Sequence, residues 1–157
     1  MKQIFLEIQS RLQQKVPDLK YIDKNWEQLN YDPAPVQFPC VLIDVNNVSY
    51  TQMARGNQKA EAEISIILAH LNLIRSSGQA PNKTNAYKAI ELLEEIHQAL
   101  QSFSNQNQFA PLMRIRLAKI MADKDFEVYE MTYKTEFTSY KNEPEKTPVM
   151  VEPVIQK

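Results

Sequence analysis

The sequence predicts an α+β fold in which one antiparallel or mixed sheet of four to five strands carries two helices on one face. Strand-like segments occur in two pairs, each joined by a turn, and helices stand between strand clusters, which favours an antiparallel sheet over regular strand-helix alternation. The segment from Gln58 to Asn72 alternates at first and then becomes a nearly continuous apolar run, as expected for a central strand covered on both faces.

The first predicted element is an amphipathic helix. Residues Lys2 to Lys15 place four apolar side chains on one stripe at helical spacing: Ile4, Phe5, Ile8 and Leu12. We expect this helix to end at Val16, because Pro17 disfavours helical geometry in the residue before it. A short strand is predicted from Lys20 to Asp23.

A long hairpin is predicted in the middle of the chain. Three prolines between Tyr31 and Pro39 remove backbone donors and predict an extended loop. The β-branched and apolar run that follows predicts a strand from Cys40 to about Thr51. Arg55-Gly56-Asn57 supplies a turn before the strand that begins at Gln58, so these two strands form one hairpin.

The second half of the chain predicts a helix, a second hairpin and a tail. Residues Thr84 to Phe103 carry apolar side chains at helical spacing, behind a threonine suited to cap the helix. Leu112 to Met121 and Phe126 to Tyr140 alternate between apolar and polar residues around an Asp-Lys-Asp turn, which predicts two strands. Residues 1–140 therefore form one domain. Residues 141–157, rich in proline and charge, are predicted to be an extended or disordered tail.

Composition argues against several classes of protein. Lysine and arginine total 18 against 19 for aspartate and glutamate, so the basic face of a sequence-specific nucleic-acid binder is not expected. Two glycines are too few for a nucleotide-binding loop, and a single cysteine rules out an internal disulfide and a cysteine-rich zinc site. Neither a signal peptide nor an apolar stretch of membrane-spanning length is predicted, and no cofactor is expected.

Candidate catalytic residues are few. His70 and His97 lie on apolar faces of their predicted elements without the spacing of metal ligands. Cys40 begins a buried strand, so we expect structural roles for all three residues and no catalytic residue. One alternative stays open, namely an enzyme or small-ligand-binding domain whose pocket lies between helix and sheet and uses the histidines and Tyr129 to Tyr133.

Arg114 and Arg116 form a short basic stripe on the strand that begins near Leu112. Strand alternation predicts that the two side chains share one face. No aromatic residues are interleaved with them on that face, so we expect them to pair with Glu127 and Glu130 across the second hairpin rather than with phosphate.

The order of the elements and several segments resemble those of one protein family. The segments are FPCVLIDV, QMARGNQ, AEISIILAH, and RIRLAKI followed by FEVYEMTYKTEF. From Met1 to Tyr140 the chain resembles the tail terminator, or tail completion, proteins of long-tailed phages and prophages. This resemblance implies a non-enzymatic structural protein that forms a ring, usually a hexamer, on the tail tube and joins it to the head. It also implies tail-tube and head-connector proteins as partners, no membrane partner, cytoplasmic assembly and a final location in the virion tail.

Three regions are candidates for assembly contacts. The polar turn of Arg55, Gly56 and Asn57 ends a long hairpin, a position where loops often bind partners. The strand from Phe126 to Tyr140 is long, aromatic and free of proline, so it invites pairing if it lies at a sheet edge. The tail carries four apolar residues that have no place in the core of the domain: Val149, Val151, Val154 and Ile155.

Overall fold

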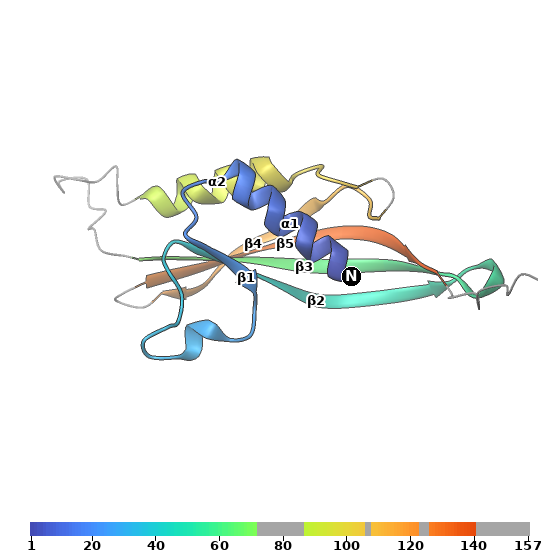
Figure 1. Ribbon diagram of the computed structural model, residues 1–157, viewed down its shortest axis with the longest axis horizontal. Helices are drawn as coiled ribbons and strands as arrows, with labels where there is room; N and C mark the ends of the chain where they lie inside the picture. The colour runs from blue at the N-terminus through green and yellow to red at the C-terminus, as the bar shows by residue number, and fades with distance from the viewer. Residues whose placement is uncertain (72–86, 106–107, 123–125, 141–157) are drawn as a thin grey trace, which may run out of the picture.

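The computed structural model describes residues 1–71, 87–105, 108–122 and 126–140. In chain order the elements are α1 (Lys2–Lys15), β1 (Tyr21–Lys24), the 3-10 turn η1 (Gln28–Asn30), β2 (Cys40–Gln52), the 3-10 turn η2 (Ala54–Gly56), β3 (Gln58–Leu71), α2 (Lys88–Leu100), β4 (Met113–Ala122) and β5 (Phe126–Ser139). The strands form one mixed sheet in the order β1-β2-β3-β5-β4, in which β1 and β2 are parallel and the other neighbours antiparallel. Both helices lie on one face of the sheet (Figure 1). This architecture confirms the predicted α+β fold.

β3 is the centre of the sheet. It pairs with β2 from Gln58 to Ala69 and with β5 over its whole length. On the side that faces the helices, alternate side chains of β3 are fully buried: Ala60, Ala62, Ile64, Ile66 and Leu68. Ser65 and Ala69 on the opposite side are buried as well. The switch from alternation to a continuous apolar run therefore marks a strand with neighbours on both edges and cover on both faces, as predicted.

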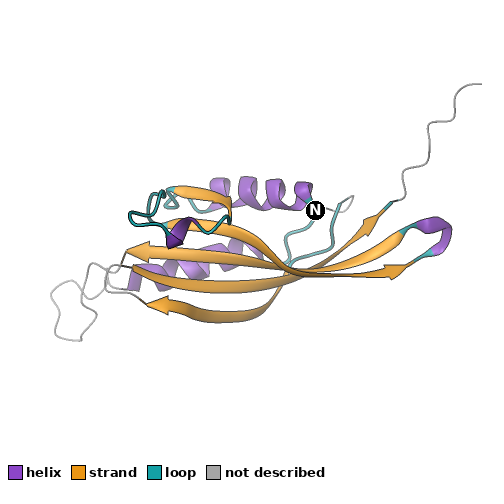
Figure 2. Cartoon of the chain, turned by 90° about the horizontal axis from the view of Figure 1, so that it is seen from below, coloured by secondary structure: helices purple, strands orange, loops and turns teal. Residues whose placement is uncertain are grey.

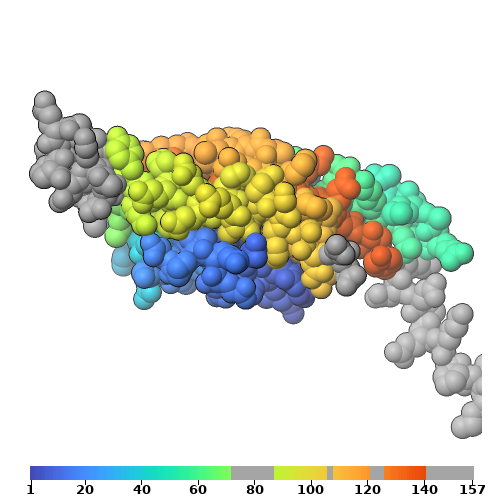
Figure 3. All heavy atoms as spheres, turned by 90° about the horizontal axis from the view of Figure 1, so that it is seen from above, coloured from blue at the N-terminus to red at the C-terminus, as the bar shows by residue number. Residues whose placement is uncertain are grey.

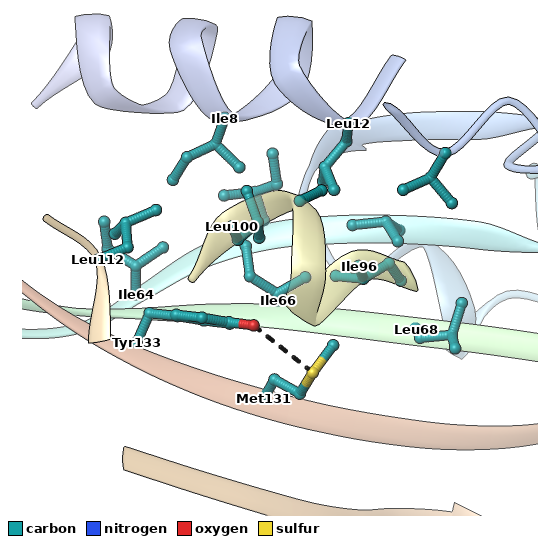
Figure 4. Close-up of a cluster of buried hydrophobic side chains, with 14 of the residues drawn as sticks. Ile8, Leu12, Ile64, Ile66, Leu68, Ile96, Leu100, Leu112, Met131 and Tyr133 are labelled. Atoms are coloured by element: carbon teal, nitrogen blue, oxygen red, sulfur yellow. Dashed lines mark hydrogen bonds between the residues drawn. The ribbon is translucent and has the colours of Figure 1, made fainter. Parts of the chain in front are cut away.

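The main core lies between the helices and the sheet (Figure 4). α1 contributes Ile4, Ile8 and Leu12, and α2 contributes Leu92, Leu93, Ile96 and Leu100. Full burial of one such side chain contributes roughly 1.5–3 kcal/mol of transfer free energy. Tyr133 of β5 is buried in the same cluster, and its hydroxyl lies 3.8 Å from Met131 Sδ and 3.2 Å from His97 Nδ1. The ring of Tyr133 can be buried because its hydroxyl group has polar contacts within the core.

α1 and α2 contact each other through Arg11. Its guanidinium donates a hydrogen bond of 3.0 Å to the carbonyl of Ala99 in the last turn of α2 and lies 5.1 Å from the centre of the Phe103 ring. α2 ends at Leu100, three residues before the predicted end, because Gln101 is extended and Ser102 has a positive φ of 61°. The predicted start of this helix at Thr84 lies outside the described residues.

The proline-containing loop covers the opposite face of the sheet, below the strands in Figure 1. A second apolar cluster forms there from Cys40, Ala69 and Val128, with Phe38 of the loop packed against it. The ring centres of Phe38 and Phe126 are 5.6 Å apart. Burial raises the pKa of the Cys40 thiol to about 12. The loop therefore buries the apolar side chains that the central strands present on the face away from the helices.

β2, β3 and β5 continue beyond the helices as a three-stranded arm that ends at the β2–β3 turn (Figure 2). Two ion pairs join neighbouring strands across the surface of the arm. Lys59 Nζ lies 2.9 Å from Glu136, and Lys134 Nζ lies 2.8 Å from Glu61. Exposed pairs of this kind contribute little stability, about 0–1 kcal/mol each, so backbone pairing holds most of the arm together.

β5 is not an edge strand. It lies between β3 and β4, so the condition under which the Phe126 to Tyr140 segment would invite pairing is not met. β4 occupies that edge instead. The alternation that the sequence shows in both strands of the second hairpin is the same whichever strand lies outside, so only the strand order distinguishes them.

We predict that Ile96→Ala destabilises the protein by about 2–5 kcal/mol, because Ile96 is fully buried and its truncation leaves a cavity. Ile90→Ala on the same helix is the matched control. Ile90 is 41% exposed, so its loss should cost about 1 kcal/mol or less. Urea or guanidinium unfolding followed by circular dichroism measures both changes. Equal losses for the two variants would contradict the assigned core face of α2.

We also predict that Cys40 resists thiol reagents in the native protein. With a pKa of about 12, only about one thiol in ten thousand is ionised at pH 8, and the sulfur is buried as well. A disulfide-exchange reagent such as dithionitrobenzoate should detect no rapidly reacting thiol without denaturant and one thiol per chain in denaturant, since the chain has a single cysteine. Fast reaction of the native protein would show that the proline-containing loop does not protect this face.

Candidate functional site

His97, His70 and Cys40, the residues weighed as catalytic candidates, lie in α2, β3 and β2. His97 of α2 contacts the Tyr133 hydroxyl, and burial followed by the charge of Arg114 lowers its pKa. His70 lies opposite Glu127 in the β3–β5 register, and Cys40 is enclosed in the second apolar cluster. Within the part of the chain that the structure describes, no group of three or more histidine, cysteine or acidic side chains is arranged to hold a metal ion.

Two of the surface grooves in the described part of the molecule bear on a ligand-binding role. One, of about 520 Å³, lies along the arm beside the segment before β4 and is lined by Met53, Phe109, Pro111, Phe137 and Tyr140, among others. The second, of about 340 Å³, lies between α1 and the β1 side of the sheet and is mostly apolar. The histidines and tyrosines on which an enzymatic or ligand-binding pocket was expected to rely line neither groove.

β4 forms an exposed apolar edge of the sheet. Within the described residues β4 pairs with β5 on one side only. Four of its large apolar side chains are about half exposed: Met113 at 56%, Ile115 at 50%, Leu117 at 49% and Ile120 at 50%. We call these four residues, with the unpaired side of the strand, the β4 edge. Long apolar edges without proline are unusual because they expose backbone donors and acceptors to other chains.

Two register shifts interrupt β4, at Ile115 and at Ile120. The first places Arg114 opposite Tyr133 and Arg116 opposite Thr132, residues that alternate along β5. The prediction that the two arginines share one face is therefore wrong, because one inserted residue reverses the phase of the alternation. Between the shifts, Arg116 to Lys119 forms a regular stretch of four paired residues.

The predicted charge pairing across the second hairpin is present with a different set of cations. Arg116 lies 3.7 Å from Glu130, as expected, whereas Glu127 pairs with Lys119 rather than with an arginine. The hydrogen bond to Glu127 raises the pKa of Lys119, whose ammonium also lies 5.2 Å from the centre of the Tyr129 ring. Arg114 instead donates its backbone N–H to Gln101 Oε1 of the segment after α2, at 3.2 Å.

One stripe of α2 faces the outer strands on the helix-covered side of the sheet. Ile90 and His97, with Gln101 just beyond the helix, share one stripe at helical spacing, and this stripe faces the outer strands because His97 contacts Tyr133 of β5. Leu117 points to the same side, since it lies opposite the buried Met131. Figure 3 shows β4 in orange along one rim of the molecule beside α2 in yellow.

The hairpin tip is a tight polar turn. Arg55 and Gly56 both have a positive φ, 61° and 80°, and both residues are exposed. The turn is closed by a hydrogen bond of 2.8 Å from the Met53 N–H to the Asn57 carbonyl. Gly56 suits this geometry, whereas Arg55 adopts it at a steric cost. The other predicted contact residues, Val149, Val151, Val154 and Ile155, lie outside the described residues.

The β4 edge was missed by the sequence analysis. Met113, Ile115 and Leu117 alternate with polar residues, but the same alternation is expected of a strand whose apolar face is buried. A usable signal is Ile120, which falls out of phase with the other three and leaves apolar side chains on both faces.

The described helices show no span of the length and apolarity needed to cross a membrane.

Among known proteins, the chain matches solved structures but no protein-family model and no curated sequence. A scan of protein-family models gives no match, and a search of curated proteins gives none either. Among solved structures, the fold is similar to that of a chain in the virion of a native gene transfer agent (GTA) particle, with a TM-score of 0.51 and 8% identical residues. The match covers 84% of this chain and 92% of that chain. At this identity the similarity concerns the fold, which the protein shares with a chain of a virion particle.

Proposed function

We propose that this protein is a non-enzymatic structural subunit of a phage-like tail, similar to tail terminators, that forms a ring joining the tail tube to the head. The observation that carries the proposal is the fold match to a gene transfer agent virion chain, which covers 84% of this chain and 92% of that chain. A match of that extent relates complete folds rather than a shared motif. The neighbours in such an assembly would be tail-tube and head-connector proteins.

The two edges of the sheet support self-association of the head-to-tail kind. The β4 edge is apolar, whereas β1 covers the opposite edge only along Cys40 to Ile43 of β2. Because the two edges differ, a contact that joins one to the other is heterologous. Heterologous contacts generate closed rings or open filaments rather than isolated dimers.

The C-terminal segment supplies further apolar groups for the same purpose. Val149, Val151, Val154 and Ile155 follow the last described strand and are separated from it by a proline-containing stretch. Docking of such an arm on a neighbouring subunit would bury them. At about 0.8 kcal/mol per buried CH₂, partial docking repeated around a ring would favour assembly.

The hairpin tip is proposed to contact a neighbouring tail protein. Arg55 and Gly56 are exposed at the end of an arm that projects away from the helices (Figure 2). The strands of the arm carry the tip away from the core, so a partner can reach it without rearrangement of the domain.

We predict that the full-length protein associates in a concentration-dependent manner and that removal of residues 142–157 weakens this association without loss of the fold. Static light scattering should give masses above the 18.2 kDa subunit for the full-length chain, and circular dichroism should be unchanged by the truncation. A full-length control with serine at four positions separates loss of apolar groups from loss of length: Val149→Ser, Val151→Ser, Val154→Ser and Ile155→Ser. Strictly monomeric full-length protein at high concentration, even with tail-tube subunits present, would refute the proposal.

We further predict that the amides of Arg55 and Gly56 exchange rapidly in the isolated subunit and become protected in the assembly. The tip is held by few backbone hydrogen bonds and has no apolar cover, so it opens at low free energy. Hydrogen exchange followed by mass spectrometry or NMR measures this, with Ile66 of β3 as a slowly exchanging reference in both states. Slow exchange at the tip of a free monomer would count against a partner-ordered turn.

A further inference from the structure

We infer that the β4 edge receives residues Val149 to Glu152 of a second copy of this chain, which add to the sheet as a strand beside β4. The inference rests on the self-assembly proposed above and identifies the surface that the C-terminal arm would occupy. The receptor is the exposed strand β4, and the donor is part of the segment that begins after Tyr140.

The lengths of the two segments match. Register shifts at Ile115 and Ile120 leave Arg116 to Lys119 as the regular part of β4, four residues long. In the arm, Pro148 and Pro153 enclose Val149 to Glu152, a proline-free window of four residues. Proline donates no hydrogen bond to a ladder, so a strand formed by the arm is limited to about this window.

The side-chain patterns of the two segments are complementary. Leu117 and Lys119 face the helix side of the sheet, and Arg116 and Ala118 face the opposite side. In an extended arm Val149 and Val151 share one face, and Met150 and Glu152 share the other. With the two valines on the helix side they would lie beside Leu117, the half-exposed apolar residue of this stretch.

The charges favour the same orientation. With the valines on the helix side, Glu152 lies on the face of the sheet that carries Arg116. The Arg116 side chain is 61% exposed, and its contact with Glu130 is long, at 3.7 Å. Glu130 also accepts a hydrogen bond from Ser65, so its carboxylate is shared between two donors. A second carboxylate beside Arg116 would therefore add a cross-strand pair of opposite charge.

The donor is assigned to a second copy because of strand direction. Eight residues lie between Tyr140 and Val149, so the arm spans about 30 Å when extended, and β4 begins opposite Lys134, about 20 Å back along β5. An arm that turned back to its own β4 would run against β5 and hence parallel to β4. A neighbouring subunit can present the arm antiparallel, which is the more stable pairing.

Disulfide trapping between separately prepared full-length variants tests the inference. Leu117→Cys in one chain and Val151→Cys in a second, size-tagged chain should form a covalent heterodimer when mixed and oxidised. The yield should exceed that of Leu6→Cys with Val151→Cys by about tenfold or more, because only residues whose Cα atoms approach within about 7 Å can bridge. Leu6 is a matched control, since it is 45% exposed and lies on α1. The buried Cys40 stays silent in this reaction.

The association of lysine variants gives an independent measurement. Leu117→Lys should weaken association as much as removal of residues 142–157 does, and the two changes combined should weaken it no further, because they remove the same contact. Leu6→Lys should leave association unchanged. Additive effects of Leu117→Lys and the truncation would overturn the inference.

The remaining outcomes separate this inference from the proposed function. A chain that carries both Leu117→Cys and Val151→Cys and forms only an internal disulfide would show that the arm binds its own subunit, which overturns docking on a second copy. Absence of cross-linking in a protein that still associates would overturn the β4 edge as receptor and leave the proposed function standing. Absence of both cross-linking and association would overturn the two together.

Discussion

The pairing of β3 with a neighbour on each side along almost its whole length is the constraint on which the structure depends. Because the backbone donors and acceptors of this strand are satisfied within the sheet, it can lie under cover on both faces without unpaired polar groups. Its helix-facing stripe, which includes Ile64 and Ile66, then dictates where α1 and α2 must pack. The opposite stripe needs a second cover, and the proline-containing loop provides it.

Local patterns were sufficient to predict the elements but not their neighbours. The stripe of Ile4, Ile8 and Leu12 and the alternation of β3 arise from periodicities within one segment, so the sequence alone reveals them. Strand order depends on contacts between distant segments, and an alternating strand has the same pattern at an edge as inside a sheet. For that reason the sequence left open whether β5 lies at an edge, whereas in the structure β4 occupies that edge and β5 lies inside.

In the candidate site as well, one feature was predictable from local sequence and another was not. The hairpin tip was predictable because Gly56 marks a backbone geometry that few residues adopt. The register shift at Ile115 has no such marker, since isoleucine fits either a regular or an irregular strand position. It nevertheless decides that Arg116 faces away from Arg114. A single inserted residue therefore determined which charges meet, and no periodicity in the sequence recorded it.

The unbroken register between β3 and β5 has a mechanical consequence. The two strands pair over the 14 residues of β3 without a shift, a length of about 45 Å. A slip by one residue would turn the core side chains toward solvent, so the ribbon neither stretches nor slides. β5 carries β4 at one end and the arm at the other. The distance between the hairpin tip and the β4 edge is therefore fixed by backbone geometry. A partner that contacts both surfaces must match that distance.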